Sequence, residues 1–190
     1  MGRAAAKPPT PARLRRRALY YLERFAASRG RLRLVLRRRA LRDAAALDLP
    51  PEPVAEAIEA LLDDLERSGL LDDAAFAAGR ARSLAAKGRP PRRIARELAA
   101  QGVEPALIDD ALCRLAAERG ETPADLELDA ALAFARRRRL GPFAPPGEAA
   151  ERRDKALAAF ARAGFGLEVA RRVLDAQPAE LDQLSGINRI

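Results

Sequence analysis

The same apolar pattern occurs twice in this chain, each time after a glycine. Gly102 is followed by Val103, and Gly164 is followed by Phe165. Four further apolar residues follow at identical offsets: Leu107, Ile108, Ala111 and Leu112 after the first glycine, and Val169, Ala170, Val173 and Leu174 after the second. A helix, a turn and a second helix that recur at matched spacing are typical of tandem repeats. The pattern therefore predicts an array of small helical units that binds along an extended surface and needs no catalytic pocket.

The composition points to helices throughout the chain. Hydrophobic residues make up 48% of the 190 residues, but much of this share is alanine, and aromatic residues reach only 4%. Leucine, alanine, arginine and glutamate dominate, and all four are strong helix formers. No convincing run of alternating apolar and polar residues, which would indicate a strand, is present. We therefore predict an all-α fold.

Proline and glycine positions divide the chain into three predicted repeats. Pro50-Pro51 and Pro90-Pro91 each separate two helical patterns, and Gly69 ends the last helix of the first repeat. A single unit of this size buries too little apolar surface to offset its ordering entropy, so the units must pack on one another. The prediction is a disordered basic tail over residues 1–11, tandem three-helix repeats over residues 12–69, 70–118 and 119–176 with about nine helices in an elongated, curved array, and a C-terminal tail over residues 177–190.

The pattern also predicts individual helix boundaries and one burial state. The first helix is expected to continue through Phe25 and to end near Gly30. Asp72 is placed to cap the first helix of the second repeat, and Pro105 to open its last helix. Cys113 lies within this last helical pattern beside apolar neighbours, so we expect its side chain to be buried.

The residues that most enzymes and metal sites need are scarce. The chain has no histidine, and its single cysteine permits neither an intrachain disulfide nor a cysteine-based zinc site. No phosphate-binding loop of the GxxxxGK[ST] type occurs. We predict that the protein is not an enzyme and has no cofactor and no metal. Three acidic pairs lack a third ligand at a known metal-site spacing and are interpreted as helix caps and solvated surface: Asp63-Asp64, Asp72-Asp73 and Asp109-Asp110.

A cytoplasmic location is expected. No run of about 18 apolar residues that could cross a membrane is present. The basic N-terminal segment superficially suits a transit peptide, but it lacks an apolar region, and its prolines oppose a continuous helix.

Charge alternates in blocks along the chain. Residues 1–42 hold fourteen lysines and arginines against one acid, and residues 43–78 hold one arginine against ten acids. The net charge is then positive over residues 79–103, negative over residues 104–135 and positive over residues 136–176, and the whole chain carries +8. In stacked repeats, such alternation would place positive charge along one face.

Three arginine clusters are the candidate residues for binding a partner or DNA. A basic face attracts nucleic acid or an acidic protein surface, whereas a solvated face that keeps helices soluble is the alternative. The aromatic residues do not interleave with the arginines, so no base-stacking platform is expected. The candidates are Arg37, Arg38 and Arg39, then Arg89, Arg92, Arg93 and Arg96, then Arg136, Arg137, Arg138 and Arg139.

A helix-turn-helix motif is the alternative that would read a DNA sequence. The segment from Ile94 through Gly102-Val103 to Leu112 has the required helix, turn and helix. Its second helix, over residues 104–118, carries four acids against one arginine, so phosphate would repel it from a DNA groove. Readout of base edges by this segment is therefore not expected.

Several short motifs occur together in an order found in one protein family. The central ones are Leu70-Leu71-Asp72-Asp73, Phe76-Ala77, Lys87-Gly88, Arg93-Ile94, Glu97-Leu98 and Gly102-Val103. Ala18-Leu19-Tyr20-Tyr21-Leu22 with Arg24 and Ser28 precedes them, and Arg162-Ala163-Gly164-Phe165 with Val169 follows. Over roughly residues 14–176 the chain resembles the RecX family of regulatory proteins. It departs from the family pattern at Arg31-Leu32 and Arg89-Pro90.

The resemblance implies both a fold and a function. RecX proteins are tandem three-helix repeats that lie in the groove of the RecA–DNA filament and restrain ATP hydrolysis, strand exchange and filament growth. The implied protein is a monomeric RecA inhibitor in DNA repair, DNA recombination and the SOS response. Its implied partners are the RecA recombinase filament and, non-specifically, single- or double-stranded DNA. Capping of filament ends and binding along their length both fit. The first alternative is a general DNA-binding helical protein with no recombinase partner, and the second is a protein–protein scaffold with no affinity for DNA.

Overall fold

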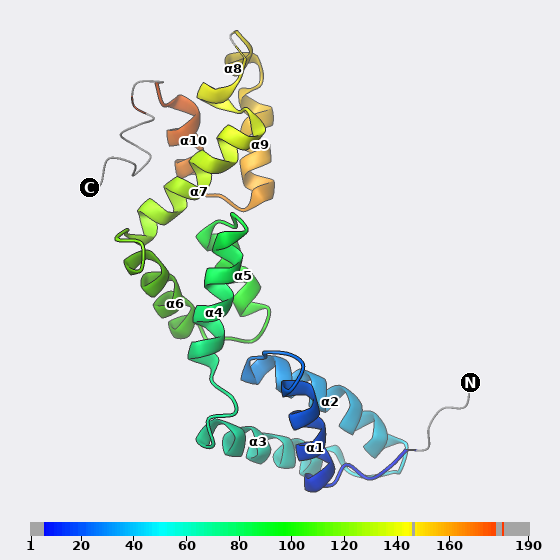
Figure 1. Ribbon diagram of the computed structural model, residues 1–190. Coiled ribbons are helices and arrows are strands. Elements are labelled where there is room, and N and C mark those ends of the chain that lie inside the picture. The colour runs from blue at the N-terminus through cyan, green and yellow to red at the C-terminus, as the bar shows by residue number, and fades with distance from the viewer. Residues whose placement is uncertain (1–5, 146, 178–179, 181–190) are drawn as a thin grey trace. The chain divides into compact units, whose positions relative to one another are not determined.

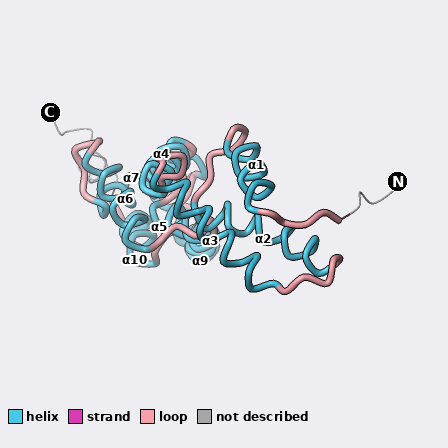
Figure 2. Tube along the Cα trace, turned by 90° about the horizontal axis from the view of Figure 1, so that it is seen from below, coloured by secondary structure: helices cyan, strands magenta, loops and turns pink. Residues whose placement is uncertain are grey.

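Helices are the regular elements of this protein. The computed structural model describes residues 6–145, 147–177 and 180, and within these ranges it contains ten α-helices, one 3₁₀ helix and no strand (Figure 2). Nine of these α-helices have at least nine residues, and the tenth, α8 (Glu148–Glu151), is a single turn. The predicted all-α fold is confirmed.

Contacts between Cα atoms divide the chain into two compact units. Unit 1 consists of Met1–Ala77 and Ala100–Glu104, and unit 2 consists of Ala78–Ala99 and Pro105–Ile190. The short segment that completes unit 1 is therefore separated in sequence from the rest of that unit.

Unit 1 is built from three long helices and the first turn of a fourth. They are α1 (Pro11–Leu22), α2 (Arg29–Ala45), α3 (Pro51–Arg67) and the start of α4 (Asp73–Ala86) (Figure 1). Apolar residues spaced three and four apart place one stripe of each helix in a shared core. The largest fully buried side chains of this core are Leu14, Leu32, Leu36, Ile58, Leu62 and Leu65.

The junction between α1 and α2 differs from the prediction. α1 ends at Leu22, and Gly30 lies in the first turn of α2 rather than at the end of α1. The Ser28 hydroxyl caps α2 by accepting a hydrogen bond from the N–H of Arg31 at 3.1 Å, so a helix starts where the glycine suggested a stop. Phe25, which the prediction places within the first helix, lies beyond the end of α1 and is 55% exposed.

Two glycine backbones touch within unit 1. A Cβ added to Gly30 would lie 2.7 Å from the Cα of Gly102, closer than real Cβ atoms approach other atoms. Gly102 also has a φ of +77°, which favours glycine. Beside this contact, the Ser28 hydroxyl donates to the carbonyl oxygen of Gln101. Together these contacts hold the 100–104 segment against the start of α2.

Unit 2 contains the rest of α4 and all the later helices. These are α5 (Pro91–Ala99), α6 (Pro105–Ala117), α7 (Pro123–Arg138), the 3₁₀ helix η1 (Gly141–Phe143), α8, α9 (Arg153–Ala163) and α10 (Leu167–Asp175). A core cluster of this unit forms where α7, α9 and α10 pack together. Three buried aromatic rings, with centroids 5.0–5.3 Å apart, lie at its centre: Phe134, Phe160 and Phe165.

Two predicted helix boundaries are confirmed, and one predicted burial state is wrong. Asp72 caps α4, because its Oδ1 accepts from the N–H of Ala75 at 2.8 Å. α6 begins at Pro105, as expected. Cys113 is exposed rather than buried. It follows the buried Ala111 by two positions, which in a helix of 3.6 residues per turn directs its side chain to the opposite face.

The two predicted tails lie partly outside the described residues. In the predicted N-terminal tail, residues 1–5 are outside them, and residues 6–10 precede α1 without forming a helix. In the predicted C-terminal tail, only residues 177 and 180 are described. Within the described ranges, every helix is too short or too polar to span a membrane.

Candidate binding surfaces

The first predicted arginine cluster lies on α2 and does not form a single patch. Successive residues of a helix point about 100° apart, so these three side chains leave α2 in different directions. Arg37 and Arg38 are exposed. Arg39 is half-buried, and its Nε lies 3.2 Å from Asp43, one turn further along. Two of the three arginines are therefore available to a partner.

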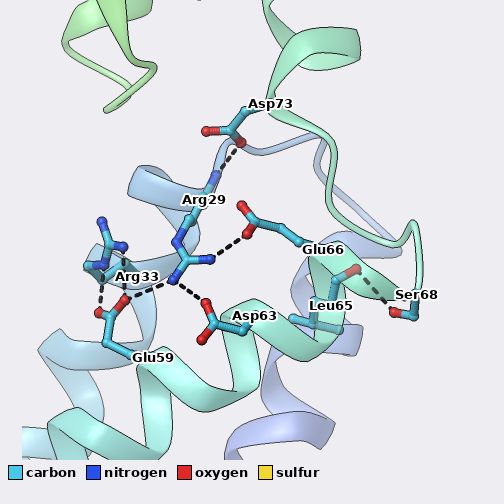
Figure 3. Close-up of polar contacts among 8 residues, drawn as sticks. All are labelled: Arg29, Arg33, Glu59, Asp63, Leu65, Glu66, Ser68 and Asp73. Atoms are coloured by element: carbon cyan, nitrogen blue, oxygen red, sulfur yellow. Dashed lines mark hydrogen bonds and ion pairs between the residues drawn. The ribbon is translucent and has the colours of Figure 1, made fainter.

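Two other arginines of α2 are held by acids of α3 (Figure 3). Arg33 donates two hydrogen bonds to the carboxylate of Glu59, at 2.7 and 2.9 Å. Arg29 donates to Glu59 at 3.1 Å, to Asp63 at 2.7 Å and also to Glu66. These five residues tie α3 to the start of α2, so the two arginines serve the fold of unit 1.

These contacts shift the pKa values of Glu59 and Arg29, and the pKa of the neighbouring Asp73 is shifted as well. The hydrogen bond from Arg33 lowers the pKa of Glu59 below its ordinary value of 4.5, although burial opposes this effect. Burial lowers the pKa of Arg29, but its hydrogen bonds to the three carboxylates outweigh burial and raise it. Asp73 accepts from the backbone N–H of Arg29 at 2.6 Å, and burial raises the pKa of this carboxyl.

The second predicted cluster lies on α5 and just before it, in unit 2. Arg89, Arg92 and Arg96 are exposed. Arg92 and Arg96 are four positions apart and share one side of α5, whereas Arg89 lies in the turn before the helix. Arg93 is half-buried, and its Nε lies 3.4 Å from Glu97. Arg93 therefore differs from the other three arginines of this cluster in being half-buried.

Arg92 also takes part in a structural contact. Its Nε lies 3.5 Å from a carboxylate oxygen of Glu127 on α7. A Cβ added to Gly166 would lie 3.0 Å from the Cζ of Arg92, and the N–H of Gly166 donates to Glu127 at 3.1 Å. Of the second cluster, only Arg89 and Arg96 make no salt bridge within the described part of the chain.

The third predicted cluster closes α7, and all four of its side chains are exposed. Arg136, Arg137 and Arg138 occupy the last turn, where positive charge complements the helix dipole. Arg139 ends the helix in the left-handed conformation, with a φ of 53°. The Cζ of Arg136 lies 5.3 Å from the centroid of the Phe143 ring, within the range of cation–π contacts.

The structure brings the second and third clusters together. A Cβ added to Gly88 would lie 3.6 Å from Nη1 of Arg137, and Gly88 directly precedes Arg89. The end of α7 therefore lies beside the turn between α4 and α5, within unit 2. We call this group the unit 2 patch and define it as Arg89 together with Arg136, Arg137, Arg138 and Arg139. Because the last four are successive residues, their side chains leave the end of α7 in different directions.

A basic hollow in unit 1 was not predicted. It lies between α1, the segment before α1, and α2, with a volume of about 350 Å³. Its lining residues are Lys7, Pro9, Arg13, Leu14, Arg16, Arg17, Tyr20, Ala40 and Asp43. The sequence held a signal for this face, because positions 13, 16, 17 and 20 have the three- and four-residue spacing of one helix side.

The expectation that aromatic residues avoid the arginines is wrong at this hollow. Tyr20 lies among the arginines of α1 and is 60% exposed. The Cζ of Arg24 lies 3.7 Å from the centroid of the Tyr20 ring. Tyr20 and Arg24 are four positions apart, so this pair becomes visible in the sequence only at the spacing of one helical turn and not as a run of neighbouring residues.

The acidic pairs that were weighed as metal ligands have other partners. Asp63 binds Arg29, Asp72 caps α4, and Asp110 lies 2.8 Å from Arg114. Across the described ranges, no three acidic, cysteine or histidine side chains come together in a way that could hold a metal ion.

Proteins of a known family align with most of this chain. A family model described as "RecX, second three-helix domain" matches residues 72–112. Regulatory protein RecX of Myxococcus xanthus is 39% identical over 171 residues, which cover 90% of this chain and 88% of that protein. A solved structure described as the crystal structure of regulatory protein RecX matches with a TM-score of 0.59, at 23% identity, over 87% of this chain and 72% of that chain, and it supports the fold. The chain therefore belongs to the RecX family of regulatory proteins.

Proposed function

We propose that this chain is a non-catalytic, cytoplasmic regulator of the RecA recombinase. It binds as a monomer in the groove of the RecA–DNA filament and inhibits ATP hydrolysis, strand exchange and filament growth, with roles in DNA repair, DNA recombination and the SOS response. The observation that carries this proposal is the 39% identity to a RecX protein over 90% of the chain, since RecX proteins are modulators of RecA.

The exposed arginines supply the contact surface in this proposal. A single exposed ion pair contributes only about 0–1 kcal/mol, so binding requires several cations that act together. The unit 2 patch offers five exposed arginines from two segments of the chain. On α2, Arg37 and Arg38 offer two more. Arg39, Arg92 and Arg93 are weaker candidates because each already lies near a carboxylate.

The test adds the protein to preformed RecA filaments on single-stranded DNA and follows ATP hydrolysis. The proposal expects hydrolysis to fall as the protein is added. Unchanged hydrolysis at concentrations that saturate naked DNA would support the alternative, a general DNA-binding protein without a recombinase partner.

Two matched variants test the role of the unit 2 patch. One changes Arg136, Arg137, Arg138 and Arg139 to glutamine and should weaken inhibition. The other changes Lys155, Arg162, Arg171 and Arg172 to glutamine, which removes the same charge from exposed positions of α9 and α10. Circular dichroism at 222 nm checks that both variants stay helical. Equal inhibition by the two variants would remove the patch from the binding surface.

A further inference from the structure

The positive charge of the basic hollow in unit 1 is not balanced by salt bridges among the residues that the structure describes. Four of its lining side chains are cations, namely Lys7, Arg13, Arg16 and Arg17, and none of them makes a salt bridge within the described part of the chain. By contrast, Arg15 points to the other side of α1, where it pairs with Asp64. The α1 cations therefore differ in their surroundings although they are adjacent in sequence.

The single acid of the hollow does not neutralise these four cations. Asp43 lies 3.2 Å from Nε of Arg39, and its side chain is only 12% exposed. Burial lowers the pKa of Arg17, and the positive charges of Arg39 and Arg13 lower it further, although Asp43 opposes this. An anion in the hollow would favour the charged form of Arg17 and so offset both the cost of burial and the repulsion.

The segment before α1 is fixed in a position that forms one wall of the hollow. The guanidinium of Arg13 donates to the carbonyl oxygen of Pro8 at 3.2 Å, and the N–H of Thr10 donates to the same oxygen at 2.9 Å. Lys7 and Pro9, on either side of Pro8, line the hollow. The wall is therefore held by hydrogen bonds from α1 and from the residue that precedes it.

An aromatic ring stands at the edge of this cationic hollow. Tyr20 lines the hollow and also a second, adjoining one that Arg15, Arg16 and Glu23 share. The guanidinium of Arg24 covers one face of the ring at 3.7 Å. Tyr20 is nevertheless 60% exposed, so a planar group can reach the ring.

We propose that the hollow between α1 and α2 binds a nucleotide of a single-stranded nucleic acid. The phosphate lies against the guanidinium groups of Arg16 and Arg17, and the base stacks on Tyr20. A hollow of about 350 Å³ lies at the lower end of the range of small-ligand sites, roughly 300–1,000 Å³. This site is separate from the arginines assigned to the filament contact.

The pairing of cations with an exposed ring favours a single-stranded nucleic acid over an acidic peptide or a nucleic acid duplex. An acidic peptide would satisfy the arginines but gives the ring no planar partner. In a duplex the bases are already stacked on one another, so a side-chain ring cannot reach them, whereas unpaired bases stack on aromatic side chains whatever their sequence.

The test measures binding of the full-length protein to a labelled oligothymidylate by fluorescence anisotropy, without recombinase. Tyr20→Leu should weaken binding by about fivefold or more, and Tyr20→Phe, which keeps the ring, should stay within about twofold of the wild type. On an abasic strand of the same length, Tyr20→Leu should have no effect, because no base is left to stack.

A matched pair of charge variants tests the phosphate contact. Arg16→Gln should weaken binding severalfold and reduce the dependence of log K on log salt by about 0.7, the value for one phosphate of a single strand. Arg31→Gln removes a cation of α2 that is also exposed but does not line the hollow, and it should leave the salt dependence nearly unchanged.

Three results would overturn the proposal. In the first, the Arg16→Gln and Arg31→Gln proteins bind the strand equally well. In the second, Tyr20→Leu weakens binding to the abasic strand as much as binding to the oligothymidylate. In the third, polyglutamate competes with the labelled strand for the protein as strongly as the unlabelled strand does. The last result would assign the hollow to an acidic protein segment. Because RecA is absent from this assay, these outcomes are distinct from failure of the proposed filament regulation, which is read from ATP hydrolysis.

Discussion

Gly30 occupies the first turn of α2, where glycine ordinarily weakens a helix by roughly 0.5–1 kcal/mol relative to alanine. Here the missing side chain lets the backbone of Gly102 approach, so the usual preference for alanine is reversed. The position is therefore decided by tertiary contact within unit 1 and not by helix propensity.

Gly30→Ala should lower the free energy of unfolding by about 1–3 kcal/mol, since the new methyl group would collide with backbone atoms that cannot rotate away. Gly79→Ala is the matched control, because Gly79 is also helical and a Cβ there would meet nothing within 4 Å. It should stabilise the protein by roughly 0.5–1 kcal/mol. Urea unfolding followed by circular dichroism measures both changes. Stabilisation by Gly30→Ala would contradict the close glycine contact.

Glu59 is expected to contribute stability that depends on pH. The hydrogen bond from Arg33 lowers its pKa in the folded state below the ordinary 4.5, so the unfolded chain binds the proton more readily. The contribution is therefore fully present above about pH 4.5 and is lost as the pH falls through the folded-state pKa. Glu59→Gln should thus cost less stability in acid than at neutral pH.

Urea titrations of the Glu59→Gln protein and the wild type across this range of pH test the effect. Glu56→Gln removes an exposed carboxylate one turn away that makes no salt bridge within the described ranges, so it controls for the change in net charge. A cost of Glu59→Gln that stays constant with pH would show that the Arg33 contact does not shift the titration.

At the scale of helices, α7 and α1 offer a comparison of two threonine N-caps. Thr122 forms a capping box with Asp125: the hydroxyl accepts from the N–H of Asp125 at 3.2 Å, and the Asp125 carboxylate accepts from the N–H of Thr122 at 3.0 Å. Thr10 occupies the same position before α1 but makes no side-chain capping bond. Both helices have proline near their start.

Thr122→Ala should lower the thermal stability of the protein, with a cost of about 1 kcal/mol from the lost cap. Thr10→Ala should leave the melting temperature nearly unchanged, because no capping bond is lost. Differential scanning calorimetry compares the two variants. A similar loss of melting temperature in both variants would mean that the capping bond between Thr122 and Asp125 does not account for the stabilisation of α7.

Helices were largely predictable from the sequence because prolines and glycines act locally. Pro91 and Pro105 open helices where their position in the pattern placed them. The end of α1 was not predictable in this way. The Ser28 hydroxyl starts α2 by accepting from the N–H of Arg31, and Gly30 contacts Gly102, which is far away in the sequence.

The candidate sites were less predictable, since the availability of an arginine depends on distant carboxylates. Nothing near Arg29 in sequence reveals that its acids lie on α3. Likewise, Arg137 lies near Gly88, the neighbour of Arg89, only because the α4–α5 turn lies beside the end of α7. Clusters of like residues in sequence therefore indicated a basic protein, while folding decided which cations face solvent.

Considered as a whole molecule, the chain carries +8, and its affinity for DNA should depend steeply on salt. For about four phosphate contacts on a single strand, a fourfold rise in salt should weaken binding roughly fiftyfold through counterion release. Anisotropy titrations in increasing sodium chloride measure this slope. A flat response would indicate that the arginine faces serve solubility alone.

The ribosome synthesises the chain from its N-terminus, so α1, α2 and α3 are synthesised before Gly102. Until then the Ser28 hydroxyl and the Gly30 backbone lack the partners they have in the finished protein. When residues 100–104 leave the exit tunnel, α4 and α5 have already emerged ahead of them. Unit 1 can therefore reach its complete form only after translation has passed into the segments of unit 2, and a nascent chain stalled at Ala99 lacks these contacts.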